Sequence, residues 1–263
     1  MSLYDDLAER VRRHIPVALA TVVEGATAGR KLLVSPGAQK RGSLGHVDLD
    51  RAVVRDVEGE LTASCTRLRR YGSRGQSDRA DVVVFVEFFA PSPRMIIFGA
   101  VDFAAALARI AHVLGHRVTV CDAREAFATR MRFPDADEVV VDWPQRLLAR
   151  IGPGLTARDA ICVLTHEARF DVPAIVAGLD TAVGYIGVMG SRRTHQDRLG
   201  RLRSVGVNEQ GLRRLHSPIG LDLGARTPEE TAVSICAELI AVRSGAPGLR
   251  SLAQSSGPIH GAL

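Results

Sequence analysis

The stretch GVMGSRR brings together residue types that bind phosphate groups. Gly187 and Gly190 would leave room for a tight turn after an apolar run, and Ser191 is suited to cap the helix that follows. A helix start offers free N–H groups and a favourable dipole, and the guanidinium groups of Arg192 and Arg193 add positive charge. We therefore expect an anion site here, most simply for phosphate; the alternative is a solvated, arginine-rich helix start.

A second glycine turn, IIFGAVDFAAA, begins like the phosphate loop of a dinucleotide-binding domain. Gly99 follows an apolar run, and Asp122 ends the next apolar run 23 residues later, where an acidic residue can bind ribose hydroxyls. The phosphate loop of dinucleotide-binding domains has three glycines in the pattern GxGxxG, and Val101 stands at the second of them. Its side chain would hinder the approach of a pyrophosphate. Asp102 adds a negative charge near the helix start, and it either caps the helix or lines the cleft. Pyrophosphate binding in the usual mode is therefore not expected.

Further candidate ligand-binding residues follow neighbouring apolar runs. LTHEARFD places Thr165, His166 and Asp171 beyond the fourth expected strand, and Arg124 follows Asp122 beyond the second. The carboxyl ends of parallel strands form one edge of a sheet, where ligands bind, so we expect these residues near one crevice. His166 is either a functional imidazole or a structural one.

The sequence from residue 94 to residue 245 alternates between apolar strands and helices. The expected strands are 95–99, 117–122, 137–143, 159–166 and 182–190, and the expected helices are 102–115, 124–131, 171–180, one from 192 and one from 227. Val- and Ile-rich runs suit strands covered on both faces, and strand–helix alternation implies right-handed crossovers in a parallel sheet. Glu238, on the last expected and largely apolar helix, either has a buried partner, which we favour, or faces a cleft.

The first 90 residues differ from the rest and are typical of a smaller α+β domain. An amphipathic helix near Tyr4 to His14 precedes the short strands PVALATVVEG and RKLLVSPG, a second amphipathic helix and the apolar strand VVVFVEFFA. The prediction is an α/β protein with a C-terminal Rossmann-like, doubly wound parallel sheet and a smaller N-terminal α+β domain. The expected bounds are 1–90 for the first domain, 91–93 for a linker, 94–245 for the second domain and 246–263 for a flexible tail.

Composition excludes several classes of protein. A hydrophobic share of 46% and a charged share of 24% are typical of a soluble globular protein, and the N-terminal apolar run is too short for a signal peptide or membrane span, so we expect a cytoplasmic location. The net charge of +5 comes from arginines spread along the chain, since only Lys31 and Lys40 are lysines, and this spread indicates no specific nucleic-acid binding. The four cysteines lack the spacing of a metal site, and Cys121 and Cys162 lie in apolar runs as small apolar residues.

The chain resembles the XdhC/CoxI family of molybdenum-cofactor accessory proteins in an ordered series of segments, IIFGAVDFAAALA, RVTVCDAR, FPDADEVVVDWP, VLTHEARFDVPAI, YIGVMGSRR and SPIGLDLGARTPEETAVSICAEL. The resemblance covers the whole chain and implies a xanthine dehydrogenase accessory factor. Such a chaperone binds molybdenum cofactor, as molybdopterin or its nucleotide form, supports its sulfuration and delivers it to an apo molybdenum hydroxylase of the xanthine dehydrogenase type. The resemblance also implies a homodimer and a cysteine desulfurase as a partner.

Two departures from the family pattern bear on function. Many relatives carry a glycine-glycine-cysteine turn in the first domain, where this chain has GSLGHVDLD, and Cys65 comes only after the following expected helix. Val101 stands where many relatives keep a glycine. The missing cysteine argues against a thiol-dependent role. The leading hypothesis, based on the resemblance and on the anion site at GVMGSRR, is a binding and delivery protein. The alternative, motivated by Gly99 and Asp122, is an NAD(P)-dependent oxidoreductase.

Overall fold

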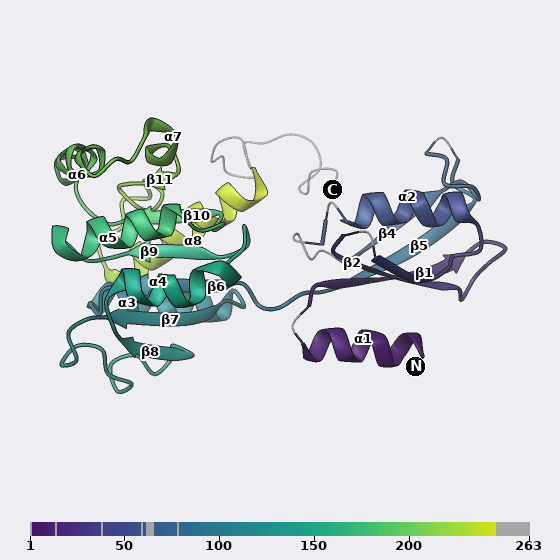
Figure 1. Cartoon of the computed structure of the whole chain (residues 1–263), viewed down its shortest axis with the longest axis horizontal. Coiled ribbons are helices and arrows are strands. Elements are labelled where there is room, and N and C mark those ends of the chain that lie inside the picture. The colour runs from purple at the N-terminus through teal and green to yellow at the C-terminus, as the bar shows by residue number, and fades with distance from the viewer. Residues whose placement is uncertain are drawn as a thin grey trace. The chain divides into compact units, whose positions relative to one another are not determined.

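The computed structural model describes residues 2–13, 15–37, 39–58, 60–61, 66–77 and 79–245. The chain divides into two compact units, Met1–Ser92 and Pro93–Leu263, whose helices and strands are labelled in Figure 1. The stretch 246–263, expected to be a flexible tail, and Cys65 lie outside the described residues. The finer domain bounds given above stay a prediction.

The first unit is an antiparallel sheet with α1 and α2 on opposite faces (Figure 1). Its elements are α1 (Leu3–Arg12), β1 (Val17–Glu24), β2 (Lys31–Ser35), β3 (Gln39–Gly42), α2 (Val47–Glu58), β4 (Arg67–Tyr71) and β5 (Val82–Phe89), and the strand order is β3-β2-β1-β5-β4. Alternate residues of β1, Ala18, Ala20 and Val22, belong to one apolar cluster with Val53 and Val57 of α2. This unit therefore has a hydrophobic core of its own, as expected for an α+β domain.

The second unit is built on a six-stranded parallel sheet. Its elements are β6 (Arg94–Phe98), α3 (Asp102–Val113), β7 (Arg117–Asp122), β8 (Glu138–Val141), α4 (Pro144–Ile151), the 3₁₀ turn η1 (Gly152–Gly154), β9 (Ala160–Val163), α5 (Ala168–Leu179), β10 (Tyr185–Val188), α6 (Arg192–Ser204), α7 (Glu209–Leu212), β11 (Leu215–His216) and α8 (Pro228–Ser244). The strand order β11-β10-β9-β6-β7-β8 is that of doubly wound dinucleotide-binding folds. The predicted Rossmann-like fold is confirmed.

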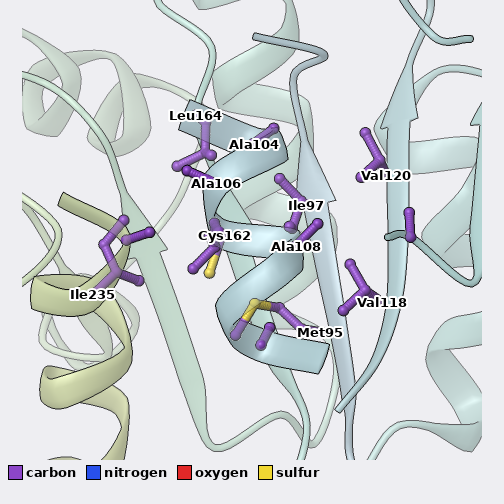
Figure 2. Close-up of a cluster of buried hydrophobic side chains, with 14 of the residues drawn as sticks. Met95, Ile97, Ala104, Ala106, Ala108, Val118, Val120, Cys162, Leu164 and Ile235 are labelled. Atoms are coloured by element: carbon purple, nitrogen blue, oxygen red, sulfur yellow. The ribbon is translucent and has the colours of Figure 1, made fainter. Parts of the chain in front are cut away.

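Helices cover both faces of this sheet because successive strand residues point to opposite sides. Met95 and Ile97 of β6 belong to the apolar cluster that includes α3 and Ile235 of α8, as Figure 2 shows. Ile96 and Phe98 belong to the cluster on the other side, with residues of α4, α5 and α6. No helix in the described part of the chain has the length and apolar character needed to span a membrane.

Two local expectations are wrong. Residues 124–131 form turns rather than a helix, and the backbone N–H and the side chain of Arg124 at their start both bind Asp122. Gly187, expected to open a turn, lies inside β10 and is buried. A Cβ at this position would lie 2.4 Å from Cδ1 of Ile219, so the glycine gives room for Ile219 against the strand.

Replacing Gly187 by alanine is expected to destabilise the second unit by about 1–3 kcal/mol, because the added methyl group overlaps Ile219 and the Tyr185 ring. The matched control is Gly200→Ala in α6, where a Cβ has nothing within 4 Å and alanine favours the helix by about 1 kcal/mol. Urea unfolding followed by circular dichroism measures both variants. Equal stability of the two would contradict the packing role of Gly187.

Candidate functional site

The strand order reverses between β6 and β9, and ligands of doubly wound folds bind beyond the carboxyl ends of the strands at such a point. Gly99 follows β6 with φ +109°, a conformation that favours glycine. A Cβ at Gly99 would lie 2.7 Å from Cγ2 of Thr165, which follows β9. The two loops therefore touch at this point, and two of the predicted site residues, Gly99 and Thr165, lie side by side.

Asp122 ends β7 and is almost fully buried, with an exposure of 4%. Its carboxylate accepts four hydrogen bonds, from the N–H groups of Ala100 and Arg124 and from Nε and Nη2 of the Arg124 side chain, at 2.8 to 2.9 Å. Burial would raise the pKa of this carboxyl, but the hydrogen bonds from Arg124 and Ala100 outweigh it and hold the pKa below its usual value. The residue expected to bind a ribose is thus engaged by the protein itself.

The side chain of Arg124 extends from Asp122 toward the loop that follows β9. Its Nη1 atom lies 3.3 Å from Oε1 of Glu167, and its guanidinium lies 4.7 Å from the ring centre of Phe127 and 5.7 Å from that of Phe170. These contacts join the loops on both sides of β6.

Asp102 does not cap the helix that it opens. Val101 is the N-cap residue of α3, no side chain caps the helix there, and Asp102 is its first residue. The Asp102 side chain is 88% exposed and pairs with Arg132 at 3.3 Å. The capping alternative is therefore wrong, because Val101 occupies the extended position from which a side chain could reach back to the helix.

The turn between β10 and α6 has the local structure that the sequence indicated. Gly190 adopts φ +148°, Ser191 is the N-cap residue, and its hydroxyl accepts a hydrogen bond from the N–H of Thr194 at 3.1 Å. Arg192 and Arg193 open the helix, are exposed, and make no ion pair with another described residue. The cap and the helix start are confirmed, and anion binding stays a prediction.

A buried ion pair lies at this edge of the sheet and was missed in the sequence. Nη2 of Arg198 lies 3.0 Å from the Asp171 carboxylate, and both side chains are at most 4% exposed. Asp171 also accepts a hydrogen bond from the Thr165 hydroxyl, and Arg198 donates to the Met189 carbonyl at 2.9 Å and to Oγ of Ser217 at 3.3 Å. The pair therefore connects the loops after β9, β10 and β11. The available signal was Asp171 itself, a charge on the apolar helix α5 that requires a partner.

Two histidines differ in their surroundings at this edge. His166 is exposed beyond β9, next to Thr165. His195 of α6 is partly buried, and burial, followed by the nearby Arg198 charge, lowers its pKa and favours the neutral imidazole.

The loop after β11 is fastened to α8 by Glu238. Oε2 of Glu238 accepts hydrogen bonds from the Tyr185 hydroxyl at 2.6 Å and from the Gly220 N–H at 2.9 Å. Gly220 has φ +95°, and a Cβ there would lie 2.6 Å from Oγ of Ser234. The predicted buried partner of Glu238 is confirmed, and its role is structural.

The described cysteines have no exposed thiol. Cys121, Cys162 and Cys236 are buried and free, and burial raises the pKa of Cys121 to about 12 and that of Cys236 to about 11. Cys121 and Cys162 lie in β7 and β9, where they pack as small apolar residues, as predicted. Among the residues that the structure describes, no group of three or more His, Cys, Asp or Glu side chains could hold a metal ion.

Two family models match the chain. The one described as the XdhC Rossmann domain matches residues 95–239, and the one described as the XdhC and CoxI family matches residues 10–72. Among solved structures, one named as a xanthine dehydrogenase from Bacillus halodurans is similar with a TM-score of 0.53 and 22% identity, covering 95% of this chain and 97% of the other. At this identity the likeness shows the fold.

Curated proteins are similar over part of their length. The uncharacterized protein YqeB of Escherichia coli K12 is 27% identical over 94% of this chain and 47% of its own, and a probable xanthine dehydrogenase subunit from Bacillus subtilis 168 is 35% identical over 61% and 46%. The molybdenum cofactor insertion chaperone PaoD of E. coli K12 is 26% identical over 59% and 42%. The matched regions make up less than half the length of each of these relatives.

Breaking the buried pair by Arg198→Met is expected to destabilise the second unit by about 3–5 kcal/mol, because Asp171 is left as an uncompensated buried charge. The matched control, Arg203→Met, removes an exposed pair with Glu209 from the same helix and is expected to change stability little. Chemical unfolding of both variants measures the difference. A small effect at Arg198 would contradict the stabilising role of the pair.

The Asp122 carboxyl is expected to make stability depend on pH. Because its pKa is lowered in the folded protein, its contribution is present above the unfolded pKa and is lost as the pH falls through the folded value. Melting temperatures measured from about pH 6 down to about pH 3 should therefore fall less steeply for Asp122→Asn than for the wild type. If the melting temperatures of the two proteins fell in parallel with pH, Asp122 would not be the carboxyl responsible.

Proposed function

Because the chain belongs to the XdhC and CoxI family, we propose that it is an accessory protein that binds molybdenum cofactor, supports its sulfuration and inserts it into xanthine dehydrogenase-type molybdenum hydroxylases. The family relation to a protein named as a molybdenum cofactor insertion chaperone, and to one named as a probable component of xanthine dehydrogenase, supports a role in maturation. In this proposal the cofactor is cargo rather than a resident group.

The turn from Gly190 to Arg193 is the observation that carries the proposal. Molybdopterin ends in a phosphate, and its nucleotide form contains a pyrophosphate, so either form needs an anion site. The capped start of α6 presents N–H groups and the positive end of the helix dipole, and the guanidinium groups of Arg192 and Arg193 have no ion-pair partner among the described residues. We propose that Gly190, Ser191 and the two arginines hold the phosphate.

The remaining residues of the edge suit the less charged part of the cargo. Gly99 and Thr165 line the point where the strand order reverses, with His166 exposed beside them and Asp102 exposed at the start of α3. Asp122 and Arg124 shape the loop after β7 through their mutual hydrogen bonds. Gly187 contributes through the strand, by admitting Ile219. We propose that the pterin lies over the ends of β6 and β9.

In sulfuration, the described part of this chain offers no reactive thiol. The described thiols are buried and have raised pKa values, which makes them poor nucleophiles. We propose that the sulfur atom is supplied by a partner, a cysteine desulfurase, while this chain holds the cofactor. The other proposed partners are the apo molybdenum hydroxylase and a second copy of the chain.

The test is to purify the protein from cells that make the cofactor and to detect the oxidised pterin by fluorescence. The wild type is expected to retain pterin, whereas the double variant Arg192→Ala, Arg193→Ala is expected to retain about tenfold less, because each lost charge-assisted contact weakens phosphate binding. A double variant at the other end of the same helix, Arg201→Ala with Arg203→Ala, removes the same charge and is expected to retain wild-type amounts.

Three outcomes count against the proposal. Wild-type protein without pterin overturns cofactor binding. Equal losses of pterin in both double variants would show that only the overall charge matters and that the start of α6 is not a phosphate site. Saturable binding of NADH by the wild type, measured by fluorescence titration, would instead favour the oxidoreductase alternative.

A further inference from the structure

Asp122 occupies the position from which dinucleotide-binding folds hold a ribose. It ends the strand next to β6, and the Gly99 turn follows β6. An acidic side chain at this place accepts hydrogen bonds from ribose hydroxyls in such folds. The chain therefore keeps the acceptor for a nucleotide, although Val101 hinders a pyrophosphate.

Arg124 takes up the acceptor positions that a ribose would use. A carboxylate accepts about four hydrogen bonds. Two of those at Asp122 come from the backbone N–H groups of Ala100 and Arg124, and these fix the two loops. The other two come from the Arg124 fork, with Nε on Oδ1 at 2.9 Å and Nη2 on Oδ2 at 2.8 Å. Two hydroxyl groups of a vicinal diol would need these same two positions.

The guanidinium group of Arg124 is also held by residues other than Asp122. Glu167, in the loop after β9, pairs with Nη1 of Arg124 at 3.3 Å, and the Phe127 ring lies 4.7 Å from the guanidinium. Since β7 and β9 are the two neighbours of β6, the pair of Arg124 with Glu167 spans the carboxyl end of β6. A nucleotide that entered over Gly99 would have to displace it.

We propose that Arg124 is a specificity-determining residue that excludes ribose diols, and so NAD(P) and related nucleotides in the usual binding mode, from the Asp122 carboxylate. The arginine mimics the diol from within the protein, with a bidentate fork in place of two hydroxyl groups. This inference goes beyond the proposed function because it concerns what the site rejects. Its test contains no pterin, and therefore it can fail while cofactor binding holds.

The test is a calorimetric titration with ADP, with Arg124→Ser as the principal variant. The wild type is expected to bind ADP no better than it binds 2′,3′-dideoxy-ADP at concentrations up to about 1 mM, and Arg124→Ser is expected to bind ADP at least about tenfold more tightly than the wild type, because two acceptor positions become free for the ribose. The gain should be absent with 2′,3′-dideoxy-ADP, which lacks the diol. It should also be absent when Asp122→Asn is combined with Arg124→Ser.

The matched control is Arg169→Ser. Arg169 also pairs with Glu167, at 2.8 Å, and also lies over Phe170, but no contact joins it to Asp122. Its loss is expected to leave the affinity for ADP as in the wild type. A second variant, Arg124→Gln, keeps a long side chain without the fork and replaces Arg124→Ser if melting curves show that the serine variant does not fold.

Four results would overturn the exclusion of ribose by Arg124. Binding of ADP by the wild type that is lost with 2′,3′-dideoxy-ADP, no gain in either folded Arg124 variant, or equal gains in the Arg124 and Arg169 variants would each overturn the proposal. A gain that persists with the dideoxy analogue would also overturn it, because the phosphates rather than the diol would then be responsible.

Discussion

The buried ion pair between Asp171 and Arg198 is the interaction on which the carboxyl edge of the parallel sheet depends. Removing two charges from water is costly, and the cost is offset only when the remaining hydrogen-bonding positions are filled. Here they are filled by Thr165, Met189 and Ser217, which follow three neighbouring strands. The pair therefore links the three loops that contain these residues. Because Arg198 belongs to α6, the pair also holds the start of this helix, where the proposed anion site lies, against the neighbouring loops.

The same edge is asymmetric in charge. On the side of β7, the guanidinium of Arg124 is matched by Asp122 and Glu167. On the side of β10, Arg192 and Arg193 have no acidic partner among the described residues. Positive potential is thus available at one end of the edge and neutralised at the other. An elongated ligand with a single anionic end would be oriented by this difference before it made any close contact.

Much of the fold could be predicted from the sequence, because hydrophobic runs of strand length alternate with helices and because caps are local. The serine cap at Ser191 and the buried partner of Glu238 followed from such rules. Arg198 could not be recognised, because it is one of five arginines on a polar helix and is indistinguishable in the sequence from its solvated neighbours until the fold brings Asp171 to it. Asp122 is a second residue whose contacts could not be predicted from the sequence. Its position was correct, but its hydrogen bonds come from residues whose proximity depends on the folded loop.

The pairing of α3 with α8 has a consequence for how the protein is made. The α3 helix shares its apolar cluster with α8, the last helix in the described part of the chain, and the strands between them contribute to the same cluster. While the ribosome is still adding the residues before α8, α3 has an uncovered apolar flank, whereas the first unit already has all of its described strands and helices. Domains complete their folding as units during translation. The second unit therefore keeps an apolar surface that favours aggregation and chaperone binding until α8 emerges.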